Sequence, residues 1–144
     1  MKIIKKQKNN NHEDTILEIN LKNLNKNYSS IHNKVSVNTE VAATVKANGY
    51  GLGVEYIANS LIAIGCKTFF VATLEEGLKL RKVNNLINII ILNGLNKYKI
   101  NDYIKKNLIP VINNLDQLKV SERYSKEKKR IRIAIHFDTG MSRL

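Results

Sequence analysis

The feature that most constrains the fold of this chain is a regular alternation, from residue 40 onward, of short apolar segments with segments of helical periodicity. Apolar runs bounded by turn residues predict buried strands, and five of them occur, at residues 40–46, 68–71, 87–92, 109–112 and 131–137. Strands that alternate with helices form right-handed βαβ units around a parallel sheet. The pattern therefore predicts an α/β fold, either doubly wound or part of a (β/α)₈ barrel.

The segments between these strands carry the signals that begin and end helices. From Val54 the apolar residues recur at i, i+3, i+4, i+7 and i+8, which predicts an amphipathic helix, and Gly65 is placed to terminate it. Thr73 and Glu76 have the spacing of a capping box, which predicts a helix that begins just after Thr73 and runs through Lys82. The helix signals thus agree with the strand pattern on either side of them.

Two further helices are predicted from single capping residues. Asn114 is a candidate N-cap, and we expect the helix that follows it to turn Leu115, Leu118 and Tyr124 inward. Asn20 is a candidate N-cap for a helix that precedes the first strand of the alternating pattern.

The composition is that of a globular protein, because 43% of the residues are hydrophobic and 25% are charged. The exception is the polar, basic stretch 1–14, which we expect to be a disordered tail ahead of one folded unit, residues 15–144. This stretch lacks the apolar segment of a signal peptide, and the longest apolar run, 86–92, is too short to cross a bilayer. The single cysteine, Cys66, fits a reducing cytosol, so we expect a cytoplasmic protein.

The formal net charge of +12 could indicate a nucleic-acid partner. The charges are scattered along the chain, however, and no basic cluster is interleaved with aromatic residues. We therefore expect neither a nucleic acid nor a membrane as a partner, and we interpret the lysines as solvated surface side chains. His12 and His32 have no partner at the spacing of metal ligands, so no metal site is predicted.

The candidate chemistry lies where the first strand of the alternating pattern ends. Lys46 follows an apolar run and is followed by a loop that contains Gly49, Gly51 and Gly53. Desolvation at a strand end penalises the charged ammonium, and an unprotonated lysine amine forms Schiff bases with carbonyl compounds. The glycines let backbone N–H groups approach a ligand, and the helix N-terminus after them favours phosphate. An amine beside an anion site indicates a phosphorylated aldehyde as cofactor.

Three stretches, in this order, resemble motifs of the alanine racemases: residues 45–53 (VKANGYGLG), 71–77 (VATLEEG) and 138–144 (DTGMSRL). The resemblance extends from about Thr15 to the last residue. It implies that the parallel sheet is a partial (β/α)₈ TIM-type barrel of about five strands with helices, without the C-terminal β domain of that family. A complete barrel has eight strands and typically ~250 residues. We therefore expect this chain to be the front part of such a barrel.

The resemblance also implies pyridoxal 5'-phosphate as cofactor and alanine as substrate, with interconversion of L- and D-alanine for peptidoglycan. It implies that Lys46 forms a Schiff base with the cofactor and moves the α-proton on one face of the substrate. It implies that Tyr50 hydrogen-bonds the cofactor phosphate. It implies that Arg143 contacts the substrate carboxylate, for which a planar guanidinium is suited.

This sequence departs from the pattern of the family at two points. Many alanine racemases carry, two residues before the aspartate of the last motif, a lysine that is modified to a carbamate and braces the arginine. This chain has His136 there, and imidazole cannot form that carbamate. The opposite-face tyrosine, which the partner subunit of the family's homodimer supplies, and the arginine that faces the pyridine nitrogen come later in the family than residue 144. We therefore expect weak or no racemase activity from this polypeptide alone.

Other interpretations of the same residues remain open. The chain could be a non-catalytic fragment that binds the cofactor or complements a second chain. Basic amino-acid decarboxylases and a one-domain pyridoxal-phosphate carrier family use a related barrel and lysine, although the Gly-Tyr-Gly after Lys46 favours the racemases. A dinucleotide loop would need a third glycine where this chain has Val54. Residues 138–140 match the aspartic-protease signature, but those proteases are mostly β.

Overall fold

A computed structural model of the chain describes residues 3–4, 17–127 and 130–142. Within these ranges, five strands form one parallel sheet: β3 (Ala43–Thr44), β4 (Thr68–Val71), β5 (Asn88–Ile91), β6 (Leu108–Ile112) and β7 (Ala134–Ile135). Their order in the sheet is their order in the sequence. Successive right-handed crossovers in one direction place the helices on one face of a sheet, as in a barrel, whereas a doubly wound sheet reverses its strand order. The predicted barrel-type fold is therefore confirmed and the doubly wound alternative is excluded.

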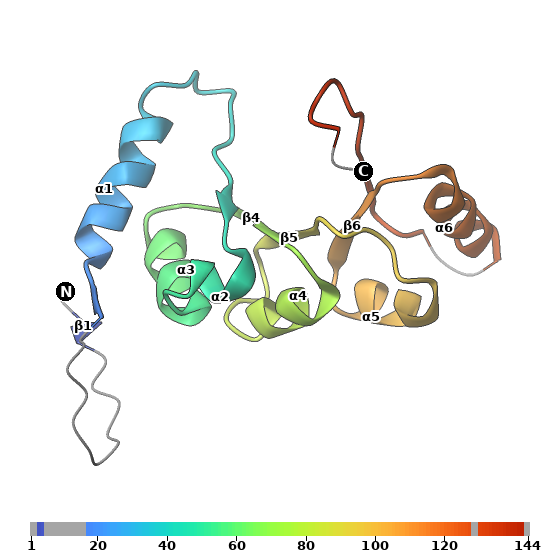
Figure 1. The fold of residues 1–144 in the computed structure, drawn as a ribbon, viewed down its shortest axis with the longest axis horizontal. Helices are drawn as coiled ribbons and strands as arrows, with labels where there is room; N and C mark the ends of the chain where they lie inside the picture. Colours follow the sequence, from blue (N-terminus) through green and yellow to red (C-terminus); the bar gives the residue numbers. More distant parts are fainter. Residues whose placement is uncertain (1–2, 5–16, 128–129, 143–144) are drawn as a thin grey trace, which may run out of the picture.

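The helices follow the strands in alternation (Figure 1). A short helical turn, α2 (Lys46–Tyr50), comes directly after β3. The longer elements are α3 (Val54–Ala63), α4 (Leu74–Arg81), the 3₁₀ turn η1 (Lys97–Lys99), α5 (Ile100–Lys105) and α6 (Leu115–Glu127). Figure 1 shows α3, α4 and α5 side by side along the same side of the strands.

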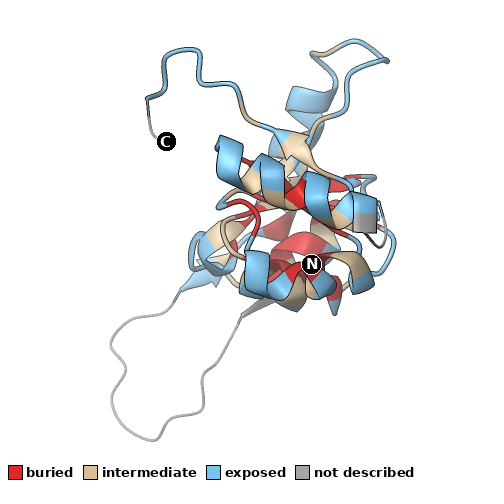
Figure 2. Ribbon diagram, turned by 90° about the vertical axis from the view of Figure 1, so that its right-hand side faces the viewer, coloured by how far each residue is buried: buried red, intermediate tan, exposed pale blue. Residues whose placement is uncertain are grey.

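The core lies between the sheet and these helices, where Figure 2 shows the buried residues. Phe69, Val71, Ile89 and Ile91 are completely buried there. Side chains alternate between the two faces of a strand, so the residues between them point to the other face. We call this other face, which carries Thr44, Phe70 and Ile90, the open face of the sheet. Thr44 is exposed and Phe70 is only partly buried, so the open face is less covered than the helix side.

Helix α1 (Leu21–His32) precedes the sheet and packs against α3. The Asn20 side chain accepts a hydrogen bond from the Asn23 N–H at 3.1 Å, which confirms the predicted N-cap. The Tyr28 hydroxyl donates to the carbonyl oxygen of Val41 at 3.0 Å and thereby joins α1 to the segment that leads into β3. Burial raises the pKa of Tyr28 to about 12.

The predicted capping box at the start of α4 and the predicted start of α3 at Val54 are confirmed. The first and last strands of the sheet are shorter than predicted and contain two residues each. The pairing nevertheless continues past both, because the Val45 N–H donates to Phe70 O at 2.9 Å and the His136 N–H donates to Ile112 O at 3.0 Å.

The predicted inward face of the last helix is wrong for Leu115 and Leu118 and correct for Tyr124. Leu115 and Leu118 of α6 are 72% and 37% exposed. Helix α6 instead turns Val120, Ser121 and Tyr124 toward the core, a face opposite to Leu115. Helical periodicity located the helix but not its rotation, which packing decides.

At the N-terminus, β1 (Ile3–Ile4) pairs antiparallel with β2 (Glu18–Ile19). The remainder of the predicted tail 1–14, and residues 15–16, lie outside the described residues. Among the helices that the structure describes, none is both long enough and apolar enough to cross a membrane.

Candidate active site

The backbone adopts a left-handed turn directly after Lys46. The torsion angles (φ, ψ) are 51° and 48° at Ala47, 56° and 43° at Asn48, and 67° and 40° at Gly49, and φ is 56° at Tyr50. We call residues 47–50 the left-handed turn. A left-handed conformation costs a non-glycine residue roughly 1–2 kcal/mol, and three of these four residues are not glycine. The local sequence therefore does not favour this turn, and contacts from outside must stabilise it.

Two backbone bonds close the loop that contains the left-handed turn, and one side-chain bond joins the turn to α3. The Gly51 N–H donates to Ala47 O at 2.8 Å, and the Gly53 N–H donates to Asn48 O at 2.9 Å. The side chain of Asn48 accepts a hydrogen bond from the Val54 N–H, the first residue of α3, at 3.1 Å. Since the N-cap position of α3 is glycine and has no side chain, Asn48 takes over the capping role from within the turn.

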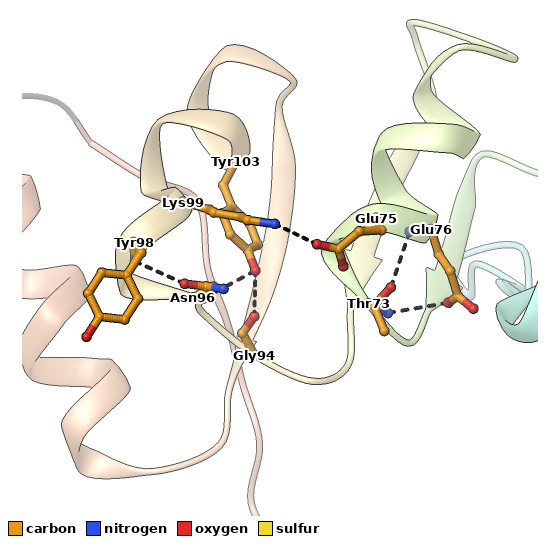
Figure 3. Close-up of polar contacts among 8 residues, drawn as sticks. All are labelled: Thr73, Glu75, Glu76, Gly94, Asn96, Tyr98, Lys99 and Tyr103. Atoms are coloured by element: carbon orange, nitrogen blue, oxygen red, sulfur yellow. Dashed lines mark hydrogen bonds and ion pairs between the residues drawn. The ribbon is translucent and has the colours of Figure 1, made fainter.

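The strongest contact to the turn comes from α4. The Ala47 N–H donates to Glu76 Oε1 at 2.7 Å. The second carboxylate oxygen, Oε2, accepts from the Ala72 N–H at 2.7 Å and from the Thr73 N–H at 3.3 Å. Glu76 thus connects the residues that follow β3 with those that follow β4. Glu75, its neighbour, points to the opposite side and pairs with Lys99 at 2.8 Å (Figure 3).

The sequence predicted Glu76 as a helix-capping residue and missed its bond to Ala47. The two residues are 29 positions apart. The Thr-x-x-Glu spacing indicates only the local capping bonds, and no sequence signal indicates the contact with the turn.

Lys46 lies just past the C-terminal end of β3, as the first residue of α2. Val45, which precedes it, is 3% exposed and belongs to the core. Lys46 is partly buried. In the part of the chain that the structure describes, no side chain forms an ion pair or hydrogen bond with the Lys46 ammonium. Active sites of (β/α)₈ barrels lie at the C-terminal ends of the strands, and Lys46 has that position.

The other predicted site residues are placed less completely. Tyr50 is the last residue of the left-handed turn that follows Lys46, and its side chain is 61% exposed. Arg143 lies outside the described residues. His136 is partly buried and continues the pairing of β7 through its N–H. The structure therefore places Lys46 and Tyr50 at the two ends of the short element α2, and the placement of Arg143 stays a prediction.

The loop that precedes Arg143 is held by a carboxylate of its own. Asp138 Oδ1 accepts hydrogen bonds from the Ser142 N–H at 3.0 Å and from the Gly140 N–H at 2.9 Å. These two N–H groups lower the pKa of Asp138, because they stabilise the charged carboxylate. Asp138 is exposed. Among the described residues, no cluster of three or more His, Cys, Asp or Glu side chains could hold a metal ion.

Comparison with known proteins identifies what this chain is similar to. The family model described as "Alanine racemase, N-terminal domain" matches residues 19–144. The alanine racemase of Rickettsia prowazekii is 46% identical over 129 residues, which cover 88% of this chain and 32% of that protein. The alanine racemase of Rickettsia akari is 42% identical over 130 residues, which cover 89% of this chain and 36% of that protein. The chain thus spans about a third of the length of the curated relatives it matches.

Solved structures give the same result for the fold. The crystal structure of alanine racemase from Bartonella henselae with covalently bound pyridoxal phosphate matches with a TM-score of 0.80 and 36% identity, over 88% of this chain and 37% of that one. The alanine racemase from E. faecalis matches with a TM-score of 0.80 and 26% identity, over 88% of this chain and 34% of that one.

Proposed function

This chain belongs to the alanine racemase family, through the N-terminal domain of that family, and from that premise we propose that it carries the pyridoxal-phosphate lysine of an alanine racemase. The observation that carries the proposal is the position of Lys46. Lys46 is a partly buried residue that follows the first strand of a barrel-type sheet, and its side chain has no acidic partner among the described residues. The similar structure from Bartonella henselae is described with covalently bound pyridoxal phosphate.

The described residues fit the aldehyde end of such a cofactor. Among the described residues no side chain forms an ion pair with Lys46, and an uncharged lysine amine is the form that attacks an aldehyde. Gly51 has a φ of 85°, and a Cβ atom there would meet no atom within 4 Å, so there is open space beside the turn. Pyridoxal phosphate, when bound, supplies an electron sink that stabilises a carbanion at the α-carbon of an amino acid.

Three residues of this chain would then have separate roles in proton transfer, phosphate binding and substrate binding. The Nζ atom of Lys46 would remove the α-proton of alanine from one face, or return a proton to that face. The Tyr50 hydroxyl would donate a hydrogen bond to a phosphate oxygen, and its 61% exposure leaves the hydroxyl accessible. The Arg143 guanidinium would bind the substrate carboxylate through two parallel N–H donors. Racemisation also needs a second acid–base group on the opposite face, which the family resemblance assigns to a tyrosine of a partner subunit.

We further infer that the protein that contains this sequence is cytoplasmic and supplies D-alanine for peptidoglycan of the cell wall. We also infer that it works as a homodimer. The lone cysteine, which is buried, supports a reducing compartment. Sedimentation of the protein with and without pyridoxal phosphate tests the dimer.

Covalent labelling of Lys46 tests the proposed function directly. The protein is incubated with pyridoxal phosphate, its absorbance near ~420 nm is recorded, and the adduct is fixed with borohydride and located by peptide mass spectrometry. We expect the adduct on Lys46 and neither absorbance nor adduct there in Lys46→Ala. The exposed lysine Lys22 on α1 provides a matched control, and Lys22→Ala should label like the parent.

An adduct spread over surface lysines, or an absorbance that survives in Lys46→Ala, would overturn the proposal. Racemisation of L-alanine by the same samples separates two possible functions. Labelled protein that racemises alanine is a racemase. Protein that is labelled but does not racemise alanine is a cofactor-binding chain. This second candidate is favoured because the chain covers only 32% of the length of the Rickettsia prowazekii relative.

A further inference from the structure

The carboxylate of Glu76 lies between two strand ends and bonds to the residue that follows Lys46. We propose that Glu76 is a positioning residue for Lys46: by holding the Ala47 N–H, it fixes the left-handed turn and with it the backbone from which the lysine side chain projects. This inference rests on the proposed function of Lys46.

The geometry of the peptide bond explains how this contact can orient Lys46. The Ala47 N–H and the Lys46 carbonyl belong to one planar peptide unit. A hydrogen bond of 2.7 Å to Glu76 Oε1 therefore fixes the orientation of that plane, and with it ψ of Lys46 and φ of Ala47. The φ of Ala47 is 51°, a value that alanine adopts only when its surroundings hold it there.

The capping role of Glu76 does not account for its bonds. A capping box requires only the bond to the N-cap N–H, and that bond, from Thr73, is 3.3 Å long. The two bonds of 2.7 Å go to Ala47 and Ala72, which lie outside α4. The carboxylate therefore bonds most closely to the two strand ends, and helix capping is the lesser part of its role.

Only a glutamate fits all three donors. Each of its two oxygens accepts, one from Ala47 and the other from Ala72 and Thr73. Glutamine has the same length but one accepting oxygen, and its NH₂ group would face an N–H donor. Aspartate keeps the negative charge near the start of α4 but is one methylene shorter, so it cannot span the distance to Ala47. Conservative variants of Glu76 can therefore separate the effect of its hydrogen bond to Ala47 from the effect of its negative charge.

Glu75 provides a matched control in the same helical turn. It carries the same charge, is exposed, and pairs with Lys99 on the side away from the left-handed turn (Figure 3). Glu75→Gln removes an equal charge from the start of α4 without touching Ala47.

Amide hydrogen exchange tests the contact without any cofactor. We expect the Ala47 amide of Glu76→Gln to exchange at least ~10-fold faster than in the parent, and that of Glu75→Gln to exchange at the parent rate. Glu76→Asp should behave like Glu76→Gln and replaces it if the glutamine variant does not fold. Unchanged exchange at Ala47 in a folded Glu76 variant overturns the inference.

Labelling with pyridoxal phosphate tests the consequence for Lys46. In Glu76→Gln we expect adduct formation at Lys46 to be about tenfold slower at an unchanged far-ultraviolet circular dichroism spectrum, because a displaced amine attacks less often. Glu75→Gln should label at the parent rate. Faster exchange at Ala47 with labelling at the parent rate also overturns the inference, because Glu76 would then hold the turn without positioning the lysine.

The two experiments keep this inference distinguishable from the proposed function. A parent that is not labelled at Lys46 defeats the proposed function, and with it the positioning of a cofactor lysine, whatever exchange at Ala47 shows. A labelled parent whose Glu76 variants match it in both measurements leaves the function standing and defeats only the role of Glu76.

Discussion

Helix α4 makes the same kind of connection at both of its ends, with opposite charge. In its first turn, the Glu76 carboxylate accepts hydrogen bonds from backbone N–H groups that follow β3 and β4. At its last residue, the Arg81 guanidinium donates to the carbonyl oxygens of Ile87, Lys106 and Asn107, each at 2.8 Å. The residues that carry these carbonyls directly precede β5 and β6, so they lie at the N-terminal ends of the strands, whereas Glu76 lies at the C-terminal ends.

The two ends of α4 differ in the burial of their charged side chain and in the backbone groups to which that side chain bonds. Arg81 is only 6% exposed, and burial lowers its pKa, so its charge needs the carbonyl partners that surround it. Glu76 is less buried and holds a turn whose backbone is strained. In barrels of this type, residues at the N-terminal ends of the strands contribute stability, whereas residues at the C-terminal ends carry the chemistry. The comparison teaches that one helix can contact both ends of the strands. Arg81 stabilises the fold at the N-terminal ends, and Glu76 orients the left-handed turn at the C-terminal ends.

Arg81→Met tests the stability end and should have the largest effect. Three short charge-assisted bonds would be lost and their carbonyls left without a donor, so we expect the free energy of unfolding to fall by about 3 kcal/mol. Urea unfolding measures this change. Lys82→Met, at the exposed neighbouring position, should change it by less than ~0.5 kcal/mol. A loss as small as that of the control would remove the distinction between the two ends.

Gly77→Val tests whether close packing of α4 sets both ends together. A Cβ atom at Gly77 would lie 2.5 Å from Cδ1 of Ile91, which is completely buried, so a valine must displace this side chain in the core or push α4 away from the sheet. We expect the free energy of unfolding to fall by about 2 kcal/mol, together with faster amide exchange at Ala47. Lower stability with unchanged exchange at Ala47 would show that Glu76 reaches the turn independently of this packing.

Ala47→Gly tests whether Glu76 offsets strain in the turn. Glycine adopts a φ of 51° without steric cost, so in the Glu76→Gln background it should recover about 1 kcal/mol of unfolding free energy. Ala63→Gly in the same background is the matched control. Ala63 is the exposed last residue of α3 and has no positive φ, so glycine there relieves no strain and should not raise the free energy of unfolding. Equal effects at the two positions would mean that Ala47 is not strained.

Lowering the pH tests the loop after β7, and here we expect the smallest effect. The pKa of Asp138 is lowered in the folded chain, so its contribution to the loop is complete above the ordinary carboxyl pKa of about 4 and is lost as the pH falls through the lower folded value. The amide signals of Gly140 and Ser142 should therefore shift below about pH 4. Asp138→Asn should abolish that shift. A shift that persists in this variant would assign it to another group.

The sequence predicted the elements of the fold well and their mutual orientation poorly. Periodicity and capping residues predicted α3 from Val54 and α4 after Thr73, because both signals arise within a few residues of chain. The rotation of α6 was predicted wrongly, since Leu115 lies on the exposed side of a helix whose facing surface is chosen by its neighbours. Strand order, which separates a barrel from a doubly wound sheet, was left open by the pattern and came only from the family resemblance.

The candidate site also has features that the sequence predicted and features that only the structure shows. Its lysine and glycines were visible in the sequence because Lys46 ends an apolar run, a glycine loop follows it, and this stretch resembles a motif of the family. The glycine loop, however, is a left-handed turn that includes Ala47, Asn48 and Tyr50, and nothing in these residue types requires it.

The sequence by itself therefore determined the alternation of strands and helices, the caps, and the position of Lys46 at a strand end, because local chain geometry and side-chain periodicity decide these features. Only the tertiary structure decided the order of the strands and the left-handed turn beside Lys46. The turn is costly for its own residues and becomes stable only where packing of α4 on the sheet brings the carboxylate of Glu76 to the Ala47 N–H, 29 residues away in the chain.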